Sequence, residues 1–306
     1  MTSQTATWLR HKLRPLPRRV RPIENETIAS FIYRLAQANH IRDYELAGYL
    51  NPRLAGSQGL HRRFEVPLHA LADVSGINAV ALAHALPDVR SQFTDQDSLG
   101  VLGRPTPGEP NTTRLACRRC MATKNITTRV KVWARHDQNV CLRHQLWISQ
   151  GVNDPEDQAD VADSPEIAQA QIHHHNLIRR YGHQRVRQSY RTAQEVIDWS
   201  SNLPSPTARW QRNHHFFMRE QAKFLPWSYD FAAYYPEVVG VLSVLVSPYW
   251  RRIAISEDPA DKQRFHRQIA TNGLTNGTPE QNTPLNKWIE AHHHSRSAQT
   301  STRLYS

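Results

Sequence analysis

Apolar residues near the start of the chain recur at the spacing of one helix face. Ile28, Phe31 and Leu35 follow the i, i+3, i+7 pattern, and Asn25 is a candidate N-cap. The pattern returns at an offset of 36 residues. The aligned pairs are Leu35 and Leu71, Asn39 and Ser75, Ile41 and Ile77, Leu46 and Leu82, and Leu50 and Leu86. Each copy predicts a helix, a short polar turn and a second helix with an apolar face.

The second copy is the better candidate for a helix-turn-helix motif. Gly76 can take the positive φ of a tight turn, and Ala72 is small enough for two helices to cross closely. In the first copy His40 stands in the place of that glycine, so we expect a less regular turn there. Two hairpins packed for stability alone would give the same pattern, which leaves insertion into a DNA groove open.

The pattern of the remaining chain predicts further helices and a single strand. Arg129–Trp133 alternates polar and apolar residues, as a strand does. Residues 207–224 predict a helix. Its buried face is expected to hold Trp210, Phe217 and Phe224. The apolar run Val238–Val246 is far shorter than the roughly 20 residues of a membrane-spanning helix, and we expect it in a buried core.

The net charge of +11 indicates a polyanionic partner. Lysine and arginine side chains that neutralise phosphates release condensed counterions, which favours nucleic acid as the partner. A basic surface without a partner and an anionic membrane surface are the alternatives. No apolar run follows the N-terminal basic residues, so no secretory signal is predicted. We expect a cytoplasmic, nucleoid-associated protein.

Two arginine-rich segments supply the candidate DNA contacts. The first set is Arg14, Arg18, Arg19 and Arg21. The second set is Arg179, Arg180, Arg185 and Arg187, interleaved with Tyr181 and His183. Basic residues alternating with aromatic ones suit phosphate contact together with base or sugar packing. The alternatives are a solvated tail for the first set and the polar face of an amphipathic helix for the second.

All three cysteines of the chain lie in one short motif. Cys117 and Cys120 are separated by two residues, and Cys141 and His144 repeat that gap after twenty intervening residues. A gap of two lets both side chains of a tight turn converge on one ion. The motif therefore predicts one structural Zn²⁺ in a closed Cys₃His site, whose binding supplies folding free energy. The alternatives are His136 as the fourth ligand, or three buried thiols without a metal.

Other residues capable of chemistry form no recognisable constellation. The chain has neither a Gly-rich phosphate loop nor a nucleophile-elbow pattern, so we do not predict an enzyme. The histidine triplets 173–175 and 292–294 lack a defined set of partner ligands, and we expect solvated histidines at both.

Shifts in composition divide the chain into six segments. They are a basic extended arm (1–23), a helical, helix-turn-helix-like domain (24–100), a zinc-ribbon module (101–150), an acidic linker (151–170), a helical C-terminal domain (171–270) and a tail (271–306) that is expected to be disordered apart from a candidate short helix near Trp288. The predicted fold is mainly α, with helical hairpins, a small central Cys₃His ribbon and a helical C-terminal region.

Residues 12–150 resemble the TniQ family of transposition proteins. Leu16–Pro22 is similar to that family's proline-rich opening, and Glu26–Ala36 with Asn39 to the helix that follows it. The two knuckles, with Arg129 and Trp133 between them, are similar to its zinc ribbon. Three departures stand out. His40 replaces a common glycine, Arg118 replaces a common proline, and no second cysteine pair follows His144, so no second zinc centre is expected.

The resemblance implies helix-turn-helix elements around zinc-ribbon modules and the work of an adaptor. Its implied partners are DNA, an AAA+ ATPase, a transposase and, as a further candidate, a target-recognition complex. It predicts a zinc-containing DNA-binding accessory protein that helps to select the target site of transposition. The alternatives are a stand-alone helix-turn-helix transcription regulator with a structural zinc site, and a protein-interaction scaffold. No membrane partner is expected, and a homodimer is left open.

Overall fold

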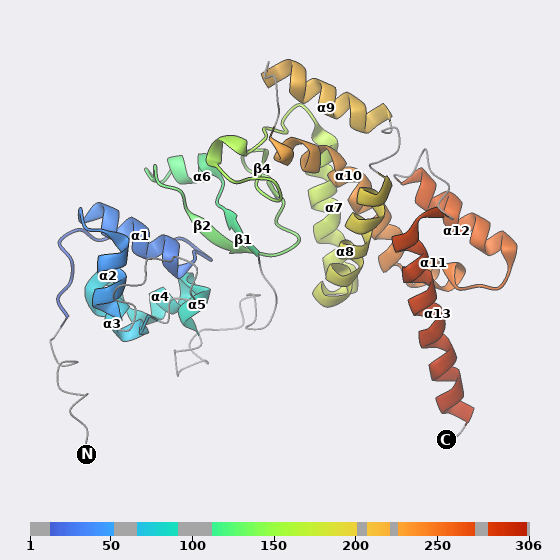
Figure 1. Ribbon diagram of the computed structural model, residues 1–306, viewed down its shortest axis with the longest axis horizontal. Helices are drawn as coiled ribbons and strands as arrows, with labels where there is room; N and C mark the ends of the chain where they lie inside the picture. Colours follow the sequence, from blue (N-terminus) through green and yellow to red (C-terminus); the bar gives the residue numbers. More distant parts are fainter. Residues whose placement is uncertain are drawn as a thin grey trace. The chain divides into compact units, whose positions relative to one another are not determined.

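The computed structural model describes residues 13–51, 66–90, 112–200, 207–220, 226–272 and 281–304. Helices make up 64% of it, and the strands form small two-stranded sheets, which confirms the mainly α fold class. The chain divides into two compact units, Met1–Arg135 and His136–Ser306 (Figure 1).

Two helical hairpins form the core of the first unit. They are α1 (Ile28–Ala38) with α2 (Asp43–Leu50), and α3 (Leu68–Ser75) with α4 (Ala79–Ala85), followed by the short α5 (Pro87–Arg90). The two hairpins share one apolar cluster. Its fully buried members include Phe31, Leu35, Leu71, Val74, Leu82 and Leu86. The helix α1 begins after Thr27, whose side chain accepts a hydrogen bond from the Ser30 N–H, so Thr27 is the N-cap in place of the expected Asn25.

The two hairpin turns use a left-handed residue at the same position of the repeat. Gly76 has φ 65°, and its N–H donates to the Ala72 carbonyl. His40 has φ 57°, although it carries a side chain that disfavours this conformation. The 36-residue offset is therefore conserved in the backbone even where the glycine is not.

A two-stranded ribbon completes the first unit. Strand β1 (Thr112–Leu115) pairs antiparallel with β2 (Lys131–Ala134), in the register Thr113 opposite Trp133, and α6 (Arg118–Ala122) lies between them in sequence. This confirms the strand predicted within Arg129–Trp133. Beneath it lies a small apolar cluster of Ile23, Met121 and Val130.

Main-chain hydrogen bonds join β2 to the start of α1. The Thr27 N–H donates to the Lys131 carbonyl at 2.9 Å, and the Trp133 N–H donates to the Asn25 carbonyl at 2.7 Å. The zinc-ribbon segment is thus attached to the first hairpin by its backbone.

The second unit is a helical array built on one apolar helix. It begins with the strands β3 (Val140–Cys141) and β4 (Leu146–Trp147) and the 3-10 turn η4 (Pro155–Asp157). The helices that follow are α7 (Pro165–Tyr181), α8 (His183–Ser200), α9 (Thr207–Glu220), α10 (Trp227–Val246), α11 (Pro248–Ala254), α12 (Pro259–Thr271) and α13 (Thr283–Leu304). Helix α10 packs against α7, α8, α9 and α11. Most of Val238–Val246 is buried within it, which confirms the predicted core segment.

By length and composition no described helix can cross a membrane alone, although α10 and α11, bent by 78° at the break between them, pass that test as a pair.

Helix α9 covers most of the predicted 207–224 segment, but the predicted buried face is wrong. Trp210 is 57% exposed and Phe217 is 46% exposed, whereas Phe216 is buried. The helix also buries Arg209 and Arg212. The Arg212 guanidinium bonds the Ala233 carbonyl at 2.9 Å and Glu237, so partners on α10 compensate its burial. Phe224 lies outside the described residues.

Helix α13 includes Trp288, where a short helix is the candidate exception to a disordered tail, and it is longer than that expectation. Leu285 and Trp288 are buried, and α13 packs against α8. The Asn282 side chain, itself buried, donates to the Val196 carbonyl at 3.1 Å and anchors the start of this helix. Residues 1–12 of the predicted arm, 91–111 around the start of the predicted ribbon, and 273–280 of the predicted tail lie outside the described residues.

Candidate metal centre and cationic surface

The four predicted zinc ligands stand on turns and short elements that bring their side chains together. Cys117 is the residue before α6, and Cys120 lies within that helix. Cys141 ends β3, and His144 lies in the turn before β4, with its N–H donating to the Cys141 carbonyl at 3.1 Å. The turn closes with Gln145 at φ 49°. Each pair is therefore presented from one tight local structure, as the two-residue gap predicts.

The donor atoms of this Cys₃His group fit a zinc ion. Their sulfur and nitrogen atoms all lie within 4.8 Å of one another, with Cys117 buried and the other three half-buried. The Cys141 Sγ lies 3.7 Å from the His144 Nδ1. Tetrahedral zinc with a Zn–S bond of about 2.3 Å and a Zn–N bond of about 2.05 Å places the two donors about 3.6 Å apart. His136, the alternative fourth ligand, belongs to a different group of side chains.

Glu26 and Arg34 form a buried ion pair next to β2. Glu26 is fully buried and Arg34 is 5% exposed, and their closest atoms, Arg34 Nη2 and Glu26 Oε2, are 2.6 Å apart. The Arg34 Nε donates to the other carboxylate oxygen at 2.8 Å, so the pair is bidentate. Glu26 also accepts from the Ile23 N–H and the Ser30 hydroxyl, and that hydroxyl accepts from the Lys131 N–H. The pair thereby links α1, β2 and the chain preceding α1.

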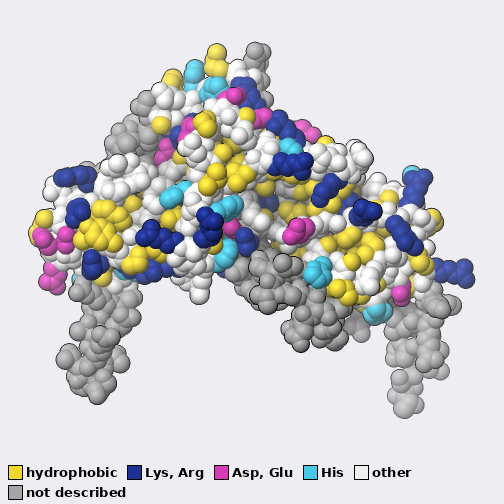
Figure 2. All heavy atoms as spheres, turned by 180° about the vertical axis from the view of Figure 1, so that it is seen from behind, with side chains coloured by type: hydrophobic (Ala, Val, Ile, Leu, Met, Phe, Trp, Pro, Cys, Tyr) yellow, Lys and Arg dark blue, Asp and Glu magenta, His cyan; other side chains and the backbone are white. Residues whose placement is uncertain are grey.

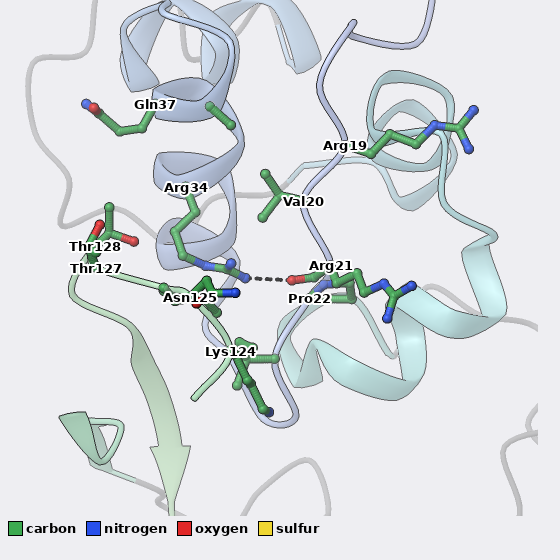
Figure 3. Close-up of a pocket in the computed structure, with 13 residues that line it drawn as sticks. Arg19, Val20, Arg21, Pro22, Arg34, Gln37, Lys124, Asn125, Thr127 and Thr128 are labelled. Atoms are coloured by element: carbon green, nitrogen blue, oxygen red, sulfur yellow. Dashed lines mark hydrogen bonds between the residues drawn. The ribbon is translucent and has the colours of Figure 1, made fainter. Parts of the chain in front are cut away.

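The described part of the basic arm, residues 13–23, is extended and hydrogen-bonded to the hairpins. The Leu16 N–H donates to the Val74 carbonyl at 2.8 Å. The main chain of Arg18 exchanges two hydrogen bonds with the side chain of Asn39, at 2.9 and 2.8 Å. The Arg21 carbonyl accepts from the Arg34 guanidinium at 2.9 Å (Figure 3). The arm's backbone is therefore anchored at three points.

The arm also forms one wall of a pocket of about 760 Å³. The other walls come from α1, with Arg34 and Gln37, and from the turn after α6, with Lys124–Thr128. Figure 3 shows the guanidinium groups of Arg19 and Arg21 directed away from Arg34. The Arg19 Nε lies 3.0 Å from where a Cβ on Gly76 would stand, so this side chain lies over the turn of the second hairpin.

The four predicted DNA-contacting arginines of the arm, Arg14, Arg18, Arg19 and Arg21, are all exposed. On the face shown in Figure 2, Lys and Arg side chains are spread over the surface with fewer Asp and Glu among them. The first unit therefore presents exposed cations beside the helical hairpins.

A comparison with known protein families matches residues 17–147 to TniQ. The chain carries a TniQ domain. TniQ is a family of non-catalytic accessory proteins of transposition. The match includes both hairpins, three of the arm's four arginines and all four Cys₃His residues, and it confirms the resemblance seen in the sequence. Neither the curated proteins nor the solved structures contain a match to the chain.

All four arginines of the second set lie outside the TniQ domain. Arg179 and Arg180 are exposed in the last turn of α7, whereas Arg185 and Arg187 are half-buried near the start of α8. The guanidinium carbons of Arg180 and Arg185 stand 5.1 and 5.8 Å from the centroid of the Tyr181 ring. The interleaved aromatic residue is thus already in contact with its own neighbouring cations.

Two features of the TniQ domain carry no assigned role in the sequence pattern. Glu26 and Arg34 form part of the resemblance, but Glu26 precedes α1 and Arg34 lies within it, and a separation of eight residues does not reveal a buried pair. Lys124 lines the pocket because the turn after α6 carries it there, which the sequence pattern does not indicate. A polar position inside an otherwise apolar helix face, as at Arg34, is the signal that points to the first of these.

Proposed function

We propose that this protein is a zinc-containing, DNA-binding accessory factor of transposition, which acts as an adaptor in target-site selection. The observation that carries the proposal is the TniQ domain over residues 17–147, with its Cys₃His group intact. Its partners are DNA, an AAA+ ATPase and a transposase, and a target-recognition complex is a further candidate. The protein works in the cytoplasm, at the nucleoid, as a monomer or a homodimer.

One structural Zn²⁺ is held by Cys117, Cys120, Cys141 and His144 in this proposal. Four protein donors close the coordination sphere, so the ion has no open position for water or substrate. Its role is to supply folding free energy to a ribbon whose strands have two to four residues each and whose apolar cluster is small.

The DNA contacts are made by Arg14, Arg18, Arg19 and Arg21 in the arm, and by Arg179, Arg180, Arg185 and Arg187 at the junction of α7 and α8. Exposure and charge support the first set, because exposed guanidinium groups pair bidentately with phosphate oxygens. The position of Arg19 over the turn at Gly76 supports a single surface formed by the arm and the second hairpin.

The test of the DNA contacts is the salt dependence of binding, measured by fluorescence anisotropy with a labelled duplex. The variant Arg19→Ala/Arg21→Ala keeps the main chain that anchors the arm and removes two exposed cations. Each lost phosphate contact lowers the slope of log K against log salt by about 0.9, so the slope is expected to fall by about 1.8. The matched control is Lys262→Ala/Arg267→Ala, which removes two exposed cations from α12.

Equal slopes for the wild type, the variant and the control would overturn the role of the arm. The adaptor role has a separate test, in which integration into target DNA is reconstituted with an AAA+ ATPase and a transposase as the partner proteins. Loss of target selection on omitting this protein is expected. Tight binding of one palindromic operator by a dimer, with no effect on integration, would favour the transcription regulator instead.

A further inference from the structure

Three side chains of the second unit lie close together and form a group that contains no cysteine. They are His136 and Asp137, in the loop that leads into β3, and His183, the first residue of α8. The imidazole nitrogens and the carboxylate oxygen that they offer all lie within 4.8 Å of one another. Asp137 is 2% exposed, and the two histidines are half-buried.

The backbone brings His183 to this point through a turn. Gly182 has φ 83° between α7 and α8, a conformation that favours glycine. The rings of His136 and His183 meet edge to face, with their centroids 6.2 Å apart and their planes at 79°. The His136 ring also lies 5.2 Å from the His174 ring and 5.8 Å from the Tyr190 ring, centroid to centroid, so aromatic contacts hold it at this point.

Helix α7 holds the backbone of Asp137 in place. The Asp137 carbonyl is bonded by the side-chain amide of Gln171 and lies 2.9 Å from the His175 Nε2. The Gln171 side-chain oxygen accepts from the N–H groups of Asn139 and Val140, both at 3.0 Å. The His175 Nε2 is also 3.8 Å from an Asp137 carboxylate oxygen. The loop that carries two of the three donors is therefore fixed on the same helix that leads into His183.

We propose that His136, Asp137 and His183 form a second metal site, for a divalent transition-metal cation of the Zn²⁺ class. Two imidazoles and one carboxylate are ligands that suit zinc, cobalt and nickel, in contrast to the thiolates of the Cys₃His group. A carboxylate buried as deeply as Asp137 is favoured by a cation beside it. Bonds of about 2.0–2.2 Å hold tetrahedral donors about 3.4 Å apart, and the three donor atoms here already lie within 4.8 Å of one another.

The ion's place in the fold indicates what it does. It joins the chain entering β3 to the start of α8, and so fixes the turn that follows α7. The two histidines and the aspartate leave a fourth position, for water or for His175, whose ring already lies beside Asp137. This departs from the single zinc ion expected from the cysteine spacing, and it does not depend on the proposed function in transposition.

The test is metal content per chain, measured by mass spectrometry on the full-length protein purified with zinc and freed of loosely bound metal. The wild type is expected to hold about two ions, and His183→Ala and Cys141→Ser about one each. The matched control, His173→Ala, removes an exposed histidine of the same α7 triplet and is expected to keep about two.

A second measurement keeps the proposal testable if His183→Ala does not fold. Asp137→Asn keeps the size of the buried side chain and removes the charged ligand, and it is expected to lose one ion. In the wild type, added zinc is expected to protect His136 and His183, and not His173, from acylation by diethyl pyrocarbonate. About one ion in the wild type, lost entirely in Cys141→Ser and unchanged in Asp137→Asn, would overturn the second site, as would equal acylation of all three histidines.

Discussion

The buried pair of Glu26 and Arg34 allows a quantitative prediction for the TniQ domain. Replacing Arg34 by Met removes the guanidinium and leaves the Glu26 carboxylate fully buried. Breaking a buried pair from one side costs about 3–5 kcal/mol, because the remaining charge is uncompensated. The loss is expected in the local stability of the contact between α1 and β2, which the carboxylate supports through Ser30 and Ile23.

The assay is amide hydrogen exchange followed by mass spectrometry on peptides covering residues 25–34 and 130–134. A loss of 3–5 kcal/mol in opening free energy corresponds to exchange faster by roughly 10²- to 4 × 10³-fold, up to the limit of an unprotected amide. Arg34→Lys keeps the charge but cannot reproduce the two-pronged contact, so it is expected to fall between the wild type and Arg34→Met. The exposed Arg42, replaced by Ala, serves as the control and should leave these peptides unchanged.

The double variant Glu26→Gln/Arg34→Met separates the pair from simple loss of packing. Removing both charges also removes the desolvation penalty, so the double variant is expected to be more stable than Arg34→Met alone. If the effects of the two single variants add without coupling, the pair does not stabilise this contact and the reasoning is wrong.

Two further predictions concern the hairpin turns and a histidine on α13. Gly76→Ala is expected to lower the free energy of unfolding by about 1–2 kcal/mol, and with it the melting temperature. The reason is that Gly76 has positive φ and that an added Cβ would lie 3.0 Å from the Arg19 side chain. His40→Gly is expected to raise the melting temperature, since His40 takes the same conformation with a side chain; a thermal melt with the opposite order would contradict the argument. Burial lowers the pKa of His292, so the unfolded chain binds its proton first as pH falls, and stability is lost on going below about pH 6.5. Urea unfolding between pH 7.5 and 5.5 should show this dependence flattened in His292→Gln and retained in His293→Gln, and equal profiles would exclude it.

The sequence predicts those parts of this fold in which neighbouring residues decide the structure. The hairpins follow from apolar spacing, and the turn at Gly76 follows from its conformational freedom. The Cys₃His group follows from two identical gaps, since each pair of donors is presented by one local turn. The core position of α10 follows from a run of apolar residues.

The sequence fails where a distant partner decides the outcome. The apolar pattern of α9 predicts that Trp210 and Phe217 are buried, yet Arg212 is buried because Glu237 and the Ala233 carbonyl lie on α10. His136, Asp137 and His183 have no common spacing, and only the packing of α7 against β3 and of α8 against α7 brings them together. Such pairings depend on tertiary contacts that no local window contains.

The structure also bears on the two interpretations of the basic arm, a solvated tail or a contact surface. Ordering one residue of a flexible chain costs about 1–2 kcal/mol, so a free tail loses much of its binding energy when it settles on DNA. The backbone of residues 13–23 is already held by Val74, Asn39 and Arg34, while Arg14, Arg18, Arg19 and Arg21 keep exposed side chains. Because the buried Glu26–Arg34 pair fixes the Arg21 carbonyl, the stability of the domain and the presentation of its cations are coupled. Arg34→Met should therefore weaken DNA binding without removing any exposed charge, which a solvated tail would not do.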